Sequence, residues 1–77
     1  AADINVHINM AQILKTLGNN IKRIRLRRKM SQGDICRAID MDRSYMSAIE
    51  SGKKNITLAV LEKIARALDV PADELLK

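Results

Sequence analysis

The N-terminal positions of the chain alternate between apolar and polar side chains. Ile4, Val6 and Ile8 are each followed by a polar residue, and a period of two is typical of an extended strand. A lone strand has no partner within a chain of 77 residues whose other segments are helical. We therefore treat residues 1–9 as an N-terminal arm that is frayed, paired with another copy, or absorbed into the first helix.

From Met10 onward the apolar residues recur three and four positions apart. This spacing predicts an amphipathic helix that ends near Lys29. Gly18 lies inside the segment, although glycine has low helix propensity. The apolar side of the predicted helix consists of Met10, Ile13, Leu14, Leu17, Ile21 and Ile24, and Arg28 continues the same spacing.

Two short helices should follow the first one. Ser31 and Asp34 have the spacing of a capping box, so one helix should begin at Gln32 and end around Asp40. Asp42 is the next good N-cap, and it predicts a helix over residues 43–51 that Gly52 closes in the left-handed conformation. The inward apolar positions of these two helices are Ile35, Ala38, Ile39, Met46 and Ile49.

The last third of the chain predicts two more helices. Thr57 is an N-cap for the fourth, and Pro71 ends that helix and opens a last turn or two over residues 72–76. The apolar stripe of the fourth helix is Val60, Leu61, Ile64, Ala65 and Leu68. Residues 10–77 should therefore form one all-α domain, a compact five-helix bundle. Its second and third helices are short and nearly adjacent, so they must cross steeply in a helix-turn-helix arrangement.

Composition and charge narrow the choice of partner. Hydrophobic residues make up 47% of the chain and aromatic residues only 1%, so the core must be aliphatic, which favours helices. The net charge is +5. Residues 1–55 carry eleven Lys or Arg against five Asp or Glu, whereas residues 56–77 carry three against four. Basic charge concentrated in one part of a chain favours a polyanionic partner, nucleic acid first and an anionic membrane second.

Other classes of function find little support in the sequence. The chain has one histidine, His7, one cysteine and no glycine-rich phosphate loop. These residues are too few to predict a catalytic site, a metal site or a cofactor site. No apolar run approaches the roughly 20 residues of a membrane span, and the core uses the apolar stripes that a surface-bound amphipathic helix would need. A lone cysteine fits a reducing compartment. We therefore expect a cytoplasmic, non-enzymatic protein without a small-molecule substrate.

Residues 21–52, "IKRIRLRRKMSQGDICRAIDMDRSYMSAIESG", resemble the lambda-repressor/Cro-like helix-turn-helix family, and "TLAVLEKIARALDV" extends the resemblance through residue 70. Within that family, "DRSYMSAIE" and "KKNIT" are most similar to the controller proteins of restriction-modification systems. The resemblance implies a regulator or repressor of transcription that binds double-stranded DNA. It also implies a structural ion pair between Arg25 and Glu50. Relatives often carry Ala in place of Cys36 and Gly in place of Asp40, and both replacements are physically tolerable.

The outward face of the third helix is suited to a DNA major groove. Short side chains allow close approach to the bases, and one arginine can fork onto a base edge. A purely solvated face would usually carry more Glu and Lys. The predicted base contacts are Arg43, Ser44, Ser47 and Ala48.

Contacts to the DNA backbone should come from segments that flank this helix. Gln32 begins the second helix, whose free amides and dipole attract a phosphate. Tyr45, the only aromatic residue, lies near the N-terminal end of the recognition helix, where its ring can pack on DNA and its hydroxyl can reach a phosphate. The alternative for Tyr45 is a lid over the core. The other predicted backbone contacts are Lys53, Lys54, Asn55, Arg27 and Arg28.

The small size of the domain predicts a homodimer. One recognition helix reads only about four base pairs, too few to define a single site in a genome. Two copies on a pseudo-palindromic operator would place their recognition helices roughly 34 Å apart. A single terminal turn should not be able to bury three large apolar side chains on its own core. We therefore predict that the dimer interface consists of Val70, Leu75 and Leu76. The arm residues Ile4, Val6 and Ile8 are a second candidate.

An antitoxin is the alternative function. Such a protein shares this fold, binds DNA as a dimer and neutralises a toxin through an added tail. The segment before Met10 is shorter than most tails of that kind. A neighbouring toxin gene would favour the antitoxin, whereas neighbouring methyltransferase and endonuclease genes would favour the controller.

Overall fold

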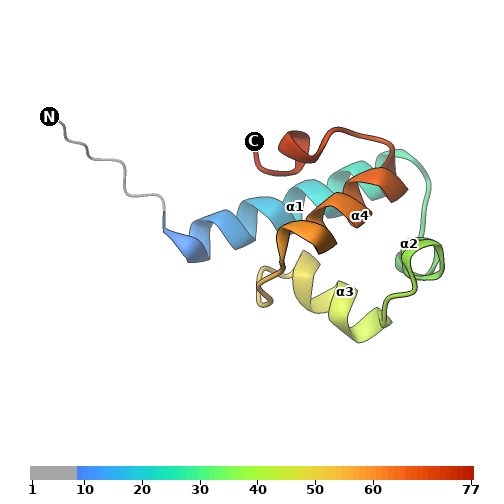
Figure 1. The fold of residues 1–77 in the computed structure, drawn as a ribbon, viewed down its shortest axis with the longest axis horizontal. Helices are drawn as coiled ribbons and strands as arrows, with labels where there is room; N and C mark the ends of the chain where they lie inside the picture. Colours follow the sequence, from blue (N-terminus) through green and yellow to red (C-terminus); the bar gives the residue numbers. More distant parts are fainter. Residues whose placement is uncertain (1–8) are drawn as a thin grey trace, which may run out of the picture.

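The computed structural model describes residues 9–77, which form helices joined by short turns (Figure 1). The elements are α1 (Met10–Arg27), α2 (Gln32–Ile39), α3 (Arg43–Glu50), α4 (Leu58–Leu68) and the 3₁₀ helix η1 (Ala72–Leu75). The predicted all-α fold with a helix-turn-helix is confirmed, but the described residues contain four α-helices and one 3₁₀ turn rather than five helices. The predicted strand of the arm lies outside the described residues.

The helices begin where the local sequence supplies a cap. Ser31 Oγ accepts the Asp34 amide at 3.0 Å, and the Asp34 carboxylate accepts the Ser31 amide at 2.7 Å, so the predicted capping box is present. Asp42 and Thr57 cap α3 and α4 as predicted. A capping box between Asn9 and Gln12 starts α1, and it was not among the predicted caps. The Asn-x-x-Gln spacing would have identified it, and Asn9 thus belongs to the helical domain rather than to the arm.

The core is aliphatic and receives side chains from every element. Its buried members are Leu17, Ile21, Ile24, Ile35, Cys36, Met46, Ile49, Leu61, Ile64, Ala65, Leu68 and Leu75. Cys36 behaves as a small apolar residue, and burial raises the pKa of its thiol. The core begins only at Leu17 in α1, so the predicted apolar stripe is partly wrong: Met10 and Ile13, at its N-terminal end, are exposed.

The C-terminal segment folds back onto the domain instead of remaining free for a partner. η1 contacts both α1 and α4 (Figure 1). Leu75 has no exposed surface, and its carbonyl accepts a hydrogen bond at 3.0 Å from the side-chain amide of the buried Asn20. The prediction that Leu75 contributes to a dimer interface is therefore wrong, because the side chain completes the core of its own chain. Val70 is half-buried against this core, and Leu76 is exposed.

Gly18 allows α1 and α3 to approach each other closely. A Cβ atom at this position would lie 2.5 Å from the carbonyl oxygens of both Ile49 and Glu50 at the end of α3. Those atoms belong to backbone, so they cannot move aside as a flexible side chain could. The low helix propensity of glycine is thus accepted at this position because any larger residue would push α3 away from α1.

We expect Gly18→Ala to lower the free energy of unfolding by about 1–3 kcal/mol, the usual cost of overpacking, although alanine is the better helix former. Urea denaturation followed by circular dichroism measures this change. Asn19→Ala, at the exposed neighbouring position of the same helix, should be neutral or stabilising. A Gly18→Ala protein as stable as the wild type would contradict the close approach of the two helices.

Candidate nucleic-acid interface

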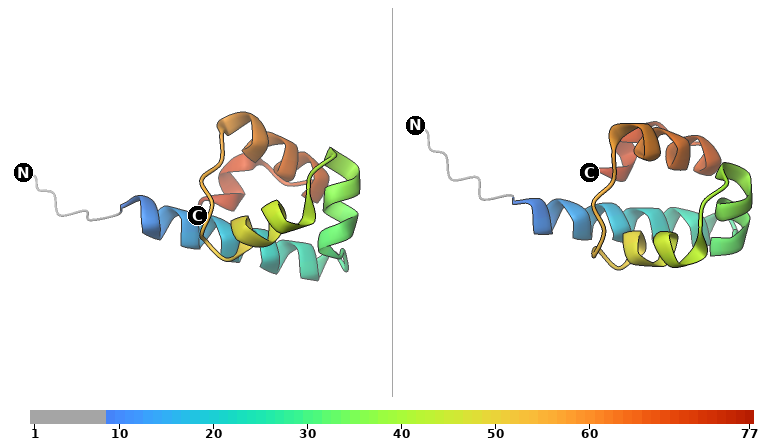
Figure 2. Two further views of the ribbon diagram at one scale, coloured as in Figure 1. Left: turned by 90° about the horizontal axis from the view of Figure 1, so that it is seen from below. Right: turned by 60° about the horizontal axis from the view of Figure 1, so that its bottom comes forward.

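α3 lies at an edge of the molecule, directly after α2 (Figure 2). The turn between the two helices is tight because Asp40 adopts the left-handed conformation, with a φ of 55°, and the Met41 amide donates to the Cys36 carbonyl at 2.9 Å. α3 packs on both α1 and α2. This packing fixes one face of α3 and leaves the other face open to solvent.

The two faces of α3 differ in the way that the sequence predicted. Its buried side chains are Met46, Ile49 and Glu50. Arg43 and Ser47 are exposed on the other face, and Ala48 is half-buried. Ser44 is also exposed, but its hydroxyl donates to the Asp42 carboxylate. Ser44 therefore contributes to the helix cap. Its hydroxyl and the Tyr45 amide hold the pKa of Asp42 below the usual range, so this cap remains charged.

Tyr45 takes the position over the core that the sequence offered as the alternative to a DNA contact, and the DNA contact stays a prediction. The side chain is half-buried and packs on the core. The Lys54 ammonium lies 5.6 Å from the centre of its ring, within the range of a cation–π interaction. The ring thus covers part of the core and also holds a lysine beside α3. Lys53 and Asn55 are exposed in the same segment, which follows the left-handed Gly52 (φ 77°).

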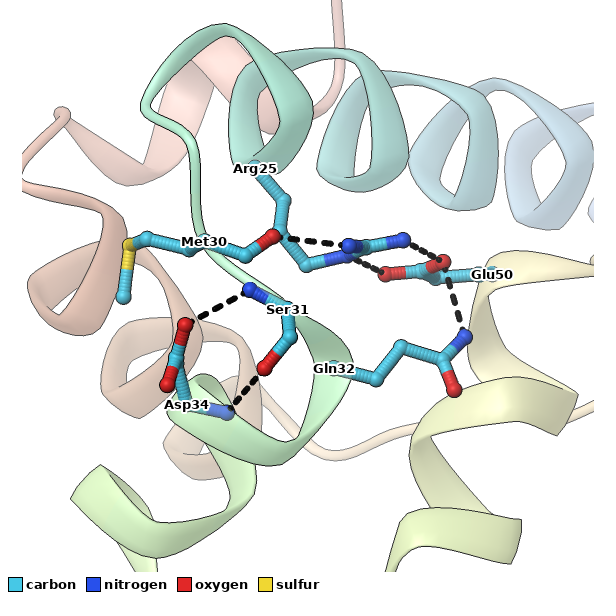
Figure 3. Close-up of polar contacts among 6 residues, drawn as sticks. All are labelled: Arg25, Met30, Ser31, Gln32, Asp34 and Glu50. Atoms are coloured by element: carbon cyan, nitrogen blue, oxygen red, sulfur yellow. Dashed lines mark hydrogen bonds and ion pairs between the residues drawn. The ribbon is translucent and has the colours of Figure 1, made fainter.

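A buried ion pair connects the ends of three helices (Figure 3). Arg25 Nε donates to Glu50 Oε2 at 2.7 Å and Arg25 Nη2 donates to Glu50 Oε1 at 3.0 Å, with the two side chains 8% and 4% exposed. The third nitrogen, Arg25 Nη1, donates to the Met30 carbonyl at 2.8 Å. The hydrogen bond to Glu50 raises the pKa of the Arg25 guanidinium. The ion pair that the resemblance implied is therefore present, and it also fixes the turn between α1 and α2.

Gln32 adds the start of α2 to this network. Its Nε2 atom donates to Glu50 Oε1 at 3.1 Å (Figure 3). Gln32 was predicted only as a phosphate contact, because spacing along the chain gives no sign of a bond between residues 18 positions apart. The bond sets the N-terminus of α2 beside the C-terminus of α3. The Asp34 amide is bound by the Ser31 cap, whereas the amides of Gln32 and Gly33, at the first two positions of α2, have no acceptor within the helix and can face an anion.

The two arginines at the end of α1 differ in their surroundings. Arg27 is exposed. Arg28 Nη2 donates to the Asp69 carbonyl at 3.2 Å, and Arg28 Nη1 lies 3.9 Å from the Asp69 carboxylate. Asp69 is the left-handed C-cap of α4, where carbonyl groups lack helical partners and a cation is favourable. The structure thus directs Arg28 to the end of α4, and its contact to the DNA backbone stays a prediction.

The arrangement of α2 and α3 can be compared with that of known proteins. A helix-turn-helix family model matches residues 21–75, which include all of α2, α3 and α4. The chain belongs to the helix-turn-helix family. It is 40% identical to the control protein C.MunI of Mycoplasma over 67 residues, which cover 86% of this chain and 90% of that protein. The sequence-based resemblance is thereby confirmed.

Solved structures of controller proteins have the same fold. The restriction-modification controller protein C.AhdI from Aeromonas hydrophila has a TM-score of 0.77 and 32% identity, over 80% of this chain and 94% of that chain. The C.Esp1396I controller tetramer, in complex with its natural 35-base-pair operator, has a TM-score of 0.72 and 34% identity, over 84% and 96% of the two chains. The chain is therefore similar to these controllers in both sequence and structure.

Two features are absent from residues 9–77. Within that range, no three His, Cys, Asp or Glu side chains converge as a metal site would require. Nor does any helix there combine the length and the apolar character that crossing a bilayer demands.

Removing either partner of the buried ion pair should strand a charge. We expect Arg25→Ala and Glu50→Ala each to lower the free energy of unfolding by about 3–5 kcal/mol. The double variant should lose clearly less than the sum of the two, because the second substitution removes the stranded charge. Urea denaturation of the four proteins at low temperature gives the coupling energy.

The matched control is the exposed pair of Arg66 and Glu62, four residues apart on α4 with 80% and 63% exposed side chains. Its two single variants should each change stability by no more than about 0.5 kcal/mol. Additive losses in the Arg25 and Glu50 cycle would show that the two side chains do not interact in solution.

Proposed function

We propose that this protein is a sequence-specific DNA-binding regulator of transcription that binds a pseudo-palindromic operator as a homodimer. The observation that carries the proposal is the exposed face of α3. It combines short side chains with one arginine, and a buried ion pair fixes the helix that bears it. Membership of the helix-turn-helix family supports the same conclusion.

Base recognition is assigned to the outward face of α3. Arg43 stands at the first position of the helix, so its guanidinium can reach O6 and N7 of a guanine in the major groove. Ser47 and Ala48 are small enough to bring the helix close to the base edges, and Ala48 suits a thymine methyl group. Ser44 contributes less than the sequence predicted, because Asp42 engages its hydroxyl.

Phosphate contacts are assigned to groups on either side of α3. The free amides at Gln32 lie at the start of α2, beside the end of α3. Lys53, Lys54 and Asn55 follow α3, and Lys54 is steered by the ring of Tyr45. Arg27 is the exposed arginine at the end of α1. The excess of basic residues in the first 55 positions favours this surface for a polyanion.

The regulated genes are proposed from the relatives. Similarity to C.MunI and to C.AhdI favours control of a restriction-modification operon over the antitoxin function. These relatives are named as regulators, which supports a non-enzymatic role that needs no cofactor. Bacterial chromosomal DNA lies in the cytoplasm, so this function implies a cytoplasmic protein. Selection of bound DNA from a random pool tests the proposal, since a regulator should enrich one two-fold sequence and a protein of another function should enrich none.

Arg43→Ala should weaken binding to the selected operator by about 1–3 kcal/mol and relax the preference at one base pair in each half-site. The loss arises because a forked contact to guanine disappears. Fluorescence anisotropy on the operator, on base-pair variants of it and on random DNA measures the effect.

Lys53→Ala is the matched control for Arg43→Ala, because it also removes one exposed positive charge beside α3. It should weaken binding to all sequences alike and reduce the salt slope by about 1. If Arg43→Ala gives the same uniform loss, Arg43 contacts only phosphate.

A further inference from the structure

Ser44 stands at the centre of the face that α3 turns outward. Each residue of an α-helix is rotated by about 100° from the one before it, so Ser44 lies opposite the buried residues Met46 and Ile49. The side chain is exposed in the first turn of α3, and the first turn of a recognition helix is the part that reaches base edges. Ser44 is therefore placed to contact a base directly.

The hydroxyl of Ser44 is hydrogen-bonded to the cap of its own helix. It donates to Oδ2 of Asp42, and the same oxygen accepts the Ser44 amide at 3.0 Å and the Tyr45 amide at 3.3 Å. The bond from the Ser44 hydroxyl, followed by those from the two amides, holds the pKa of the Asp42 carboxyl below its usual range. Asp42 is therefore ionised at neutral pH and has no proton to donate, so the hydroxyl must supply the hydrogen.

The bond to Asp42 limits Ser44 to the role of a hydrogen-bond acceptor. A serine hydroxyl has one hydrogen and two lone pairs, and with the hydrogen directed to Asp42 only lone pairs remain for an approaching group. In the major groove, N4 of cytosine and N6 of adenine are donors, whereas O6 of guanine and O4 of thymine are acceptors. Ser44 can therefore pair only with an amino group, which is a smaller role than that of a free hydroxyl but a more selective one.

This limit gives a preference for one orientation of a base pair. Each base pair has one amino group in the major groove, on adenine or on cytosine. If the two bases are exchanged, a keto oxygen takes the place of the amino group and meets the lone pairs of Ser44 with no hydrogen between them. Arg43, the preceding residue, has the opposite chemistry, because a guanidinium only donates. The start of α3 thus presents a donor beside an acceptor.

We propose that Ser44 is a specificity-determining residue that only accepts: it bonds to the amino group of a cytosine or an adenine in each half-site and disfavours guanine or thymine at that position, because Asp42 holds its hydroxyl hydrogen. The inference rests on the proposed function, since it requires α3 to lie in the major groove. It deepens that function, because the sequence predicted Ser44 as a base contact without indicating which bases it selects. Asp42 acts through Ser44 and is a positioning residue in this arrangement.

Dissociation constants for single base-pair variants of the selected operator, measured by fluorescence anisotropy, test this polarity. At one position in each half-site, the wild type should bind the amino base about tenfold more tightly than the exchanged pair, within the usual cost of one mismatch. Ser44→Ala should reduce this ratio to about twofold or less, because the acceptor is gone. The preference at the position that Arg43 reads should not change.

Asp42→Gly tests the origin of the polarity, because it frees the Ser44 hydroxyl to donate while glycine is itself an accepted N-cap residue. It should lower the ratio as far as Ser44→Ala does, by improving binding to the exchanged pair. Asp40→Gly is the matched control, since it removes a carboxylate from the same turn and glycine suits the left-handed conformation of Asp40 (φ 55°). It should strengthen binding to all sequences alike and leave the ratio unchanged. Circular dichroism should show all variants helical.

Several results would overturn the inference. Equal loss on every sequence in Ser44→Ala would mean that Ser44 contacts phosphate. A wild-type preference for guanine or thymine at the position that depends on Ser44 would mean that the hydroxyl donates. An unchanged ratio in Asp42→Gly, or an equal change in Asp40→Gly, would show that the cap does not set the polarity. A selected operator without any position that depends on Ser44 would refute this inference alone, whereas failure to select any sequence would refute the proposed function itself.

Discussion

The buried ion pair between Arg25 and Glu50 is the constraint on which the rest of the structure depends. Two buried charges are tolerated only when both have their hydrogen-bond partners. Here the Arg25 guanidinium donates to both Glu50 oxygens and to the Met30 carbonyl, and Glu50 also accepts from Gln32. The bonds can form only if the end of α1, the start of α2 and the end of α3 meet at one point. Apolar packing is non-directional and would accept several angles between these helices. The ion pair, together with the backbone contact at Gly18, selects one of them.

The sequence predicted best what is decided locally. The caps at Ser31, Asp42 and Thr57, together with the left-handed Gly52, depend on residues at most a few positions apart, and so the starts of α2 to α4 could be predicted from spacing. The outward face of α3 could also be predicted, because the two clearly apolar residues of the helix, Met46 and Ile49, define its buried side. The ion pair is different. Nothing in the spacing of Arg25 and Glu50 indicates that they meet, and only the family resemblance implied it.

The packing partners of individual apolar and charged side chains could not be predicted from the sequence. Leu75 and Leu76 are adjacent and chemically identical, yet the first is buried and the second exposed, because the turn after Pro71 and the bond from Asn20 orient them. Arg27 and Arg28 likewise differ only in the direction that the helix gives them. Met10 and Ile13 share the period of the core residues but lie beyond it. Periodicity identifies a face, whereas the partner of that face is a non-local property of the fold.

α1 extends from the buried ion pair to the end of the molecule where Met10 and Ile13 are exposed. Its C-terminal end holds α3 through Arg25, and its N-terminal end lines an apolar groove together with Leu58 and Leu76. A helix of 18 residues is about 27 Å long and resists bending, so it transmits position from one surface to the other. The spacing of two recognition helices must match one turn of DNA, and small errors in their angle would misplace both. A continuous α1 without a hinge therefore gives the proposed recognition face of α3 a fixed position relative to the opposite end of the domain.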